Sequence, residues 1–139
     1  LFLGQALSDF EFHAIPFPPL GFGKNGFGTD YGRYNVSQDP RDRGKFRTPP
    51  LFNVHKTSPY GHSGSIADLK SAISLHFDPL GVIPATELTK PQRLELYTNL
   101  KSWADEPIPE VVLLEEELDN LAAFLATLEY EAAWSVKSE

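Results

Sequence analysis

The chain has 139 residues, of which 41% are hydrophobic, and its formal net charge is −7. These values are typical of one domain with its own apolar core, while 12 prolines and 10 glycines indicate a fold rich in loops. The negative charge argues against nucleic acid and anionic membranes as main partners, because both bind basic surfaces.

Two residue types are missing from the sequence, which contains no cysteine and no methionine. Without cysteine there are no disulfides and no thiolate metal sites, and the redox compartment cannot be read from cysteine usage. Because even an initiator methionine is absent, we expect the chain to be a piece of a longer precursor whose N-terminal part is missing. No apolar run is long enough to span a membrane, and no signal-peptide pattern is found.

Residues 1 to about 64 hold most of the glycine and proline, as in HAIPFPPLGFGKNGFGTDYG, and show no sustained period of a helix or a strand. The segment is either an ordered loop or disordered. Its aromatic side chains favour order, because disordered segments have few such groups to bury. They are Phe10, Phe12, Phe17, Phe22, Phe27, Tyr31, Tyr34 and Phe46. Long ordered loops are usually functional.

A helical pattern begins at Ser65, which forms a capping box with Asp68 three residues later. The sequence Asp78-Pro79 should end this helix, because the residue before a proline is driven out of the α region. Spacing by three and four places one set of residues on a single helix face. This set is Ile66, Leu69, Ile73 and His76.

Two further helices are predicted, one from near Pro91 to about Trp103 and a last one within LLEEELDNLAAFLATLEYEAA, residues 113–133. Acidic residues crowd the first turn of the last helix, where the helix dipole favours them. Its apolar stripe consists of Leu118, Leu121, Ala122, Leu125 and Leu128. We expect Leu118, Leu121 and Leu125 to be buried. With no repeats and little sign of strands, the sequence predicts an all-α fold with a long irregular lobe.

His76 has two interpretations. A histidine on the apolar face of a helix is most often a core residue that donates to a carbonyl. Alternatively its imidazole points from the helix at a metal or a cofactor packed against that face. The proline- and glycine-bounded turn just upstream, TSPYGHSG, favours the second interpretation.

The turn contains Thr57, Pro59 and His62, and its backbone should be exposed or line a cavity. It is either a loop leading into the helix or a site whose outward carbonyls bind a hard cation or solvent. His13 and His55 lack the spacing of metal ligands, which argues against a zinc site made of histidines close in sequence.

Basic residues cluster between positions 33 and 47, interleaved with Asp30, Asp39 and Asp42. Such a mixture is usually a solvated, salt-bridged surface. In the alternative interpretation, one or two of the arginines bind an anionic group of a cofactor. The basic residues are Arg33, Arg41, Arg43, Lys45 and Arg47.

The run GRYNVSQDPRDRGKFRTPPLFNV, followed by TSPYGHSGSIADLKSAISLHF, resembles the C-terminal haem domain of the bacterial di-haem cytochrome c peroxidase and MauG family. LSDFEFHAI is similar to the stretch after the family's second haem-attachment site, and AAFLATL to its final helix, so that the resemblance covers essentially the whole chain. It implies that residues 1–139 form one class I cytochrome c-like helical domain with long irregular loops, exported to the periplasm.

The resemblance also implies roles for single residues. His76 matches the distal axial ligand of the C-terminal haem, which is methionine in the peroxidases and tyrosine in MauG. His62 matches a histidine beside that haem, and Arg47 a basic position of the F-R/K-x-P segment. Thr57 and Pro59 match residues whose carbonyls bind calcium between the two haem domains. The implied cofactors are therefore haem c and calcium.

The sequence departs from the family pattern at two places. No CxxCH motif is present, and Leu1 and Phe2 stand where the second cysteine and the proximal histidine belong. The site has either lost its haem or is incomplete in this sequence. Phe52 replaces a usual arginine, which removes one contact to a haem propionate or to the other domain.

The function implied by the resemblance is electron transfer through the C-terminal haem to a peroxide-reducing haem on an N-terminal domain. The implied partners are that N-terminal haem domain and a small redox protein as electron donor or protein substrate, and a homodimer is left open. Two histidine ligands on one iron suit electron transfer, because they leave no open position. The alternative is a haem-free structural or partner-docking module of the same fold.

Overall fold

The computed structural model describes residues 7–17, 30–108 and 110–130. Its elements are mostly short, and the longer helices all follow residue 68. In chain order they are strand β1 (Phe12–Ala14), α2 (Tyr34–Ser37), a 3-10 turn (Pro40–Asp42), strand β2 (Lys45–Arg47), a 3-10 turn (Val54–Lys56), α3 (Leu69–Phe77), α4 (Pro79–Val82), a 3-10 turn (Ala85–Glu87), α5 (Lys90–Ala104) and α6 (Glu115–Ala126).

The N-terminal half is irregular, as predicted, but it contains a small sheet that the sequence did not predict. β1 and β2 pair in antiparallel fashion with His13 opposite Phe46. Each strand has three residues, which is too short to produce a visible alternation of polar and apolar side chains. The fold within the described residues is therefore mostly helical with one two-stranded sheet, rather than purely α.

Helix α3 begins later than the capping box at Ser65 predicts. Asp68 is the N-cap, and its side chain accepts a hydrogen bond from the backbone N–H of Ser71 at 2.8 Å. Ile66 lies before the helix and forms an antiparallel bridge with Tyr60. The helix ends at Phe77, before Asp78-Pro79, as predicted. Its buried residues are Ala72 and Leu75, so the deepest face differs from the predicted one.

The core joins the turn before α3 to the three helices α3, α4 and α5. Its centre is Leu75, which is 0% exposed. The buried cluster consists of Tyr60, Ile66, Ala72, Leu75, Ile83, Leu88 and Leu96. Helix α5 agrees with the predicted helix near Pro91 to Trp103 and is capped by Thr89, which exchanges hydrogen bonds with Gln92.

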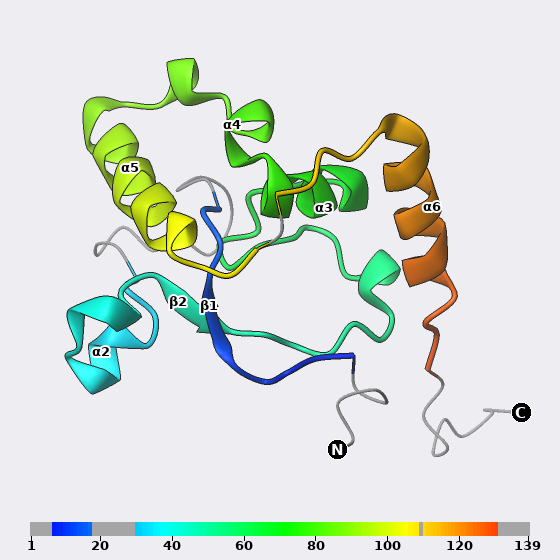
Figure 1. Ribbon diagram of the computed structural model, residues 1–139, viewed down its shortest axis with the longest axis horizontal. Coiled ribbons are helices and arrows are strands. Elements are labelled where there is room, and N and C mark those ends of the chain that lie inside the picture. The colour runs from blue at the N-terminus through cyan, green and yellow to red at the C-terminus, as the bar shows by residue number, and fades with distance from the viewer. Residues whose placement is uncertain (1–6, 18–29, 109, 131–139) are drawn as a thin grey trace, which may run out of the picture.

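The last predicted helix is present as α6, but it is only partly covered. Leu118 is 8% exposed and buried as predicted, whereas Leu121 is 36% exposed and Leu125 is half-buried, so the predicted burial is wrong for Leu121 and only partly met for Leu125. Helix α6 packs on α3, where the Lys70 ammonium lies 2.8 Å from carboxylate oxygens of Glu115 and Asp119. Figure 1 shows α5 and α6 on opposite sides of α3, with the β1–β2 pair below.

None of the helices among the described residues is both long and apolar enough to cross a membrane. The predictions for Leu1, Phe2, Phe22 and Phe27, and for the end of the last helix beyond residue 130, lie outside the described residues.

Candidate functional site

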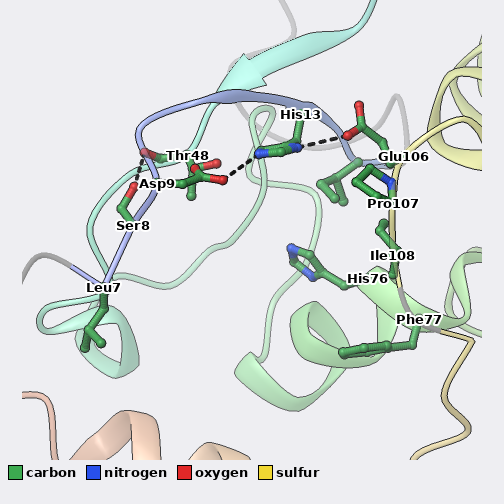
Figure 2. A pocket seen from close by; sticks show the side chains of 11 residues that line it. Leu7, Ser8, Asp9, His13, Thr48, His76, Phe77, Glu106, Pro107 and Ile108 are labelled. Atoms are coloured by element: carbon green, nitrogen blue, oxygen red, sulfur yellow. Dashed lines mark hydrogen bonds and ion pairs between the residues drawn. The ribbon is translucent and has the colours of Figure 1, made fainter. Parts of the chain in front are cut away.

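A pocket of about 570 Å³ lies between the N-terminal segment, the end of α3 and the linker that follows α5. This volume is within the range of small-molecule and cofactor sites, which runs from about 300 to 1,000 Å³. Figure 2 shows its side chains arranged in two walls, one around His76 and one around His13. The lining residues are Leu7, Ser8, Asp9, His13, Ile15, Thr48, His76, Phe77, Glu106, Pro107 and Ile108.

His76 stands in the last turn of α3, and its two ring nitrogens have different roles. Nδ1 lies 2.7 Å from the backbone oxygen of Ala72, one turn earlier. A carbonyl oxygen only accepts, so Nδ1 carries the proton and Nε2 keeps its lone pair. Burial lowers the pKa of His76, against a smaller opposing effect of the Ala72 hydrogen bond. The side chain is therefore a neutral imidazole that lines the pocket.

The orientation of His76 is set by its neighbours. Leu75, the preceding residue, is fully buried and anchors the helix. The indole N–H of Trp103 on α5 donates to the backbone oxygen of His76 at 3.3 Å. The Phe17 ring meets the imidazole edge-on at 6.2 Å between centroids. Phe17 in turn lies over Gly61, where a Cβ would come within 2.5 Å of the ring, so this position requires glycine.

The opposite wall contains His13 between two carboxylates. Its Nδ1 is 2.9 Å from Oε2 of Glu106, and its Nε2 is 2.8 Å from Oδ2 of Asp9. These contacts raise the pKa of His13, with the Glu106 hydrogen bond as the largest effect. The pKa of Asp9 is lowered, first by the backbone N–H of Glu11 and then by His13.

Glu106 is the buried member of this wall, with a side chain that is 6% exposed. Its Oε1 accepts from the backbone N–H of Ala14 at 3.0 Å and lies 3.4 Å from the Lys45 ammonium. Burial alone would raise the pKa of Glu106, but its partners His13, Ala14 and Lys45 together lower it. The linker after α5 is thereby attached to both strands of the sheet.

His62 and Arg47 do not line this pocket. The exposed ring of His62 stacks on Phe46 at 3.8 Å, and its Nε2 lies 2.8 Å from Asp30. The Arg47 guanidinium donates to the backbone oxygen of Phe10 at 3.1 Å and lies over the Phe10 ring.

The other basic residues behave mainly as a salt-bridged surface. Arg33 pairs with Asp42 at 3.1 Å, and Arg41 pairs with Asp39 at 2.6 Å. The pair with Arg41 lowers the pKa of Asp39 to about 2.

Thr57 and Pro59 are exposed, as predicted for this turn. The Thr57 hydroxyl donates to the backbone oxygen of Val54 at 2.9 Å. Within the part of the chain that the structure describes, no three His, Cys, Asp or Glu side chains gather as metal ligands. A calcium site at this turn would use backbone carbonyls and stays a prediction.

Asp9 and Glu106 were not predicted as partners of His13. Asp9 and His13 are four residues apart. This spacing brings two side chains together in a helix, but it does not predict contact here, because His13 lies in a strand and Asp9 in the segment before it. Glu106 is 93 positions from His13, in a linker that reads as an acidic loop. The family-like stretch LSDFEFHAI was the only signal near this wall.

Comparison with known proteins gives a consistent set of relatives, although no family model matches. The methylamine utilization protein MauG of Paracoccus denitrificans is 33% identical over 144 residues, which cover 89% of this chain and 35% of MauG. The cytochrome-c peroxidase IdrP1 of a Pseudomonas strain is 39% identical over 66 residues, covering 47% of this chain and 17% of that protein. The chain belongs to the di-haem cytochrome c peroxidase and MauG family.

A solved structure agrees with this family. It is the crystal structure of a MauG-like protein associated with microbial copper homeostasis, with a TM-score of 0.65 and 28% sequence identity. The match covers 88% of this chain and 36% of that one. The chain thus spans about a third or less of the length of these relatives.

The family implies haem c, and the residues of the pocket fit such a group in part. His76 offers a neutral imidazole nitrogen, which is a common axial ligand of haem iron. Leu7, Ile15, Phe77 and Ile108 supply apolar surface for a flat ring. The thioether bonds of haem c need cysteine, which the sequence does not contain.

Proposed function

We propose that the chain is the C-terminal, electron-transfer haem domain of a periplasmic di-haem oxidoreductase of the cytochrome c peroxidase and MauG type. Residues 1–139 form a single cytochrome c-like domain in this proposal. It passes electrons from a small redox protein, as donor or as protein substrate, to a peroxide-reducing haem on an N-terminal domain. The observation that carries the proposal is the neutral imidazole of His76, whose ring lines the pocket and whose Nε2 lone pair has no hydrogen-bond donor among the described residues.

The residues of the chain have separate tasks in this function. His76 would bind the iron through Nε2, while the Ala72 carbonyl fixes its tautomer and ring orientation. Phe17 and the apolar lining would keep water away from the ligand. Haem supplies reversible one-electron transfer when it is bound. Covalent attachment of haem c would require cysteines, which the given sequence does not contain.

Three further assignments rest on the family match. His62 and Arg47 would lie near the haem, as the family match implies, although neither lines the pocket of this chain. The carbonyls of Thr57 and Pro59 would bind calcium between the two domains, because a fixed turn presents oxygen ligands at low entropic cost. Calorimetric titration of the full-length protein with calcium tests this assignment, and an absence of binding heat would exclude it.

A haem-free structural or docking module of the same fold is the second candidate. It is favoured by the absence of cysteine and by Ile66, which the chain's own core already covers. A haem-free module does not account for the Nε2 lone pair of His76, which has no hydrogen-bond donor among the described residues.

The His76→Ala variant of the full-length protein separates the two candidates. If His76 is an axial ligand, its loss removes a strong-field donor and converts this haem from low to high spin, which the Soret band and electron paramagnetic resonance report. The matched control is His55→Ala, because His55 pairs with Glu129 and does not line the pocket. An unchanged spectrum in His76→Ala contradicts the ligand role, and a domain without any haem absorption supports the module.

A further inference from the structure

We propose that Asp9, His13 and Glu106 form a proton-binding site in the wall of the pocket, and that its occupancy follows the charge of the group held there. This inference rests on the proposed function and deepens it. In this proposal, the domain takes up a proton when it takes up an electron. We refer to these three residues as the proton cluster.

The geometry of the proton cluster requires a protonated imidazole. Both ring nitrogens of His13 lie at hydrogen-bond distance from carboxylate oxygens, 2.9 Å to Glu106 and 2.8 Å to Asp9. An ionised carboxylate only accepts, and a neutral imidazole has a single N–H to donate. Only the imidazolium form satisfies both contacts. Figure 2 shows the ring of His13 between the two carboxylates.

The two carboxylates differ in their access to solvent. The Glu106 side chain is 6% exposed and is held by the Ala14 N–H and by Lys45. The Asp9 side chain is 46% exposed. The buried side therefore retains the imidazole, and the exposed side offers a short route between Nε2 and bulk water.

The charges around His13 balance only when it is protonated. Asp9 lies on the same segment as His13, and Glu106 comes from the linker after α5. The ammonium of Lys45 on β2 lies 3.4 Å from Oε1 of Glu106 and so compensates part of the negative charge beside His13. With the proton, two carboxylates face two cations. Without it, the wall carries one uncompensated negative charge. The pKa of His13 is raised first by its hydrogen bond to Glu106, then by that to Asp9, with a smaller contribution from the charges of both carboxylates.

Neither of the other two basic side chains described near the pocket takes over this role. Arg47 of β2 is bound to the backbone oxygen of Phe10. His76 lines the same pocket from α3, and burial lowers its pKa so that it stays neutral. The proton cluster and His76 are thus a proton site and a lone-pair donor on opposite walls of one pocket, as Figure 2 shows.

Linkage then couples the proton to the electron. A positive charge gained in the pocket disfavours the imidazolium of His13, and by reciprocity the imidazolium favours the more reduced state. If a group held in the pocket gained one electron from a one-electron donor, His13 would take up one proton from solvent. An O–H bond of a hydronium ion would break, leaving water, and an N–H bond would form at Nε2. Loss of the electron returns the proton to water past Asp9.

The test measures the midpoint potential of this domain's haem against pH in the full-length protein by spectroelectrochemistry. Above the ordinary pKa of histidine the potential should fall with rising pH, by up to about 59 mV per unit for one proton per electron. In His13→Gln the potential should be flat over the same range. In His55→Gln, a histidine outside the pocket, it should follow the unmodified protein.

Two further variants keep the test decisive if His13→Gln does not fold. Asp9→Asn and Glu106→Gln retain the imidazole but remove one negative partner each, so the pH-dependent range should move to lower pH. A flat profile in the unmodified protein, or a slope that persists in all three variants, overturns the proton cluster. A full-length protein with no haem in this domain overturns the proposed function as well, so the two failures are distinguishable.

Discussion

The two walls of the pocket each present a histidine, and they hold it by opposite means. On the α3 wall, His76 follows the fully buried Leu75 and bonds to a carbonyl of its own helix. On the wall of the proton cluster, His13 is held by charged side chains from two distant segments. The same side chain is a neutral lone-pair donor in one place and a cation in the other, because different groups accept its protons.

The two walls should also respond to different changes in side chain and solution conditions. The apolar packing of the α3 wall is sensitive to side-chain volume and insensitive to salt. A cluster of partly exposed ion pairs is sensitive to pH and salt and tolerates changes of volume. The following predictions test this separation, beginning with the largest effect.

Leu75→Ala should damage the α3 wall most. A fully buried leucine that is truncated in a close-packed core costs about 2 to 5 kcal/mol of stability. Urea unfolding of the protein followed by circular dichroism measures this loss. Leu80→Ala is the control, since Leu80 on the adjoining α4 is 63% exposed and its truncation should change stability by about 0.5 kcal/mol or less. Similar losses in both variants would refute the assignment of Leu75 to the core.

Glu106→Gln should damage the wall of the proton cluster by less. The amide retains the size of the side chain but leaves charged partners without a counter-charge, at a cost of about 1 to 3 kcal/mol. The same urea titration at low and high salt measures it, and the difference from the unmodified protein should shrink as salt rises. Glu110→Gln, at an exposed position of the same linker, serves as the control. A salt-independent loss would argue for a packing role instead.

The pH dependence of stability should have a limb for each histidine. The folded pKa of His13 lies above its unfolded value of 6.5, so its stabilisation is complete below pH 6.5 and is lost as pH rises through the folded pKa. In haem-free protein the folded pKa of His76 lies below 6.5, so stability is lost as pH falls below 6.5. Thermal melts over a pH series should show that His13→Gln removes only the alkaline limb. Loss of the acid limb in that variant would contradict the assignment.

Leu121 lies on helix α6, which belongs to neither wall, and its truncation should give the smallest effect. Leu121→Ala should cost less than about 1 kcal/mol, because the side chain is 36% exposed. Leu118→Ala, one turn earlier and 8% exposed, is the matched comparison and should cost several times more. Equal losses from the two truncations would mean that α6 is covered more completely in the intact protein.

The sequence predicted the helices whose signals are local. Asp78-Pro79 ends α3 and a proline opens α5, because both act on the backbone of adjacent residues. The start of α3 was misplaced because Ser65 looks like an N-cap, whereas Ile66 beside it pairs with Tyr60. The burial of Leu121 was overestimated because a helical stripe predicts which face of the helix turns toward the core, but not how much of that face the neighbouring elements cover.

The candidate site divides in the same way. His76 lines the pocket and was a candidate from the sequence because its place in a helix follows from spacing. Its bond to Ala72 then leaves the lone pair on Nε2. The proton cluster could not be found, because its three members meet only through the pairing of β1 with β2 and the path of the linker after α5. No pattern within one segment encodes such a meeting.

The hydrogen bond between His13 and Glu106 joins residues 93 positions apart, and this separation bears on how the chain folds. Closing so long a loop is entropically costly, and contacts that are distant in sequence slow folding. The contacts among α3, α4 and α5 lie within residues 69–104 and should form first. We therefore expect the pocket to be completed late, with φ-values near zero at Glu106 and higher ones at Leu75. A chain that has formed its helical core would then still have an open side, through which a large planar group could enter before the linker closes over it.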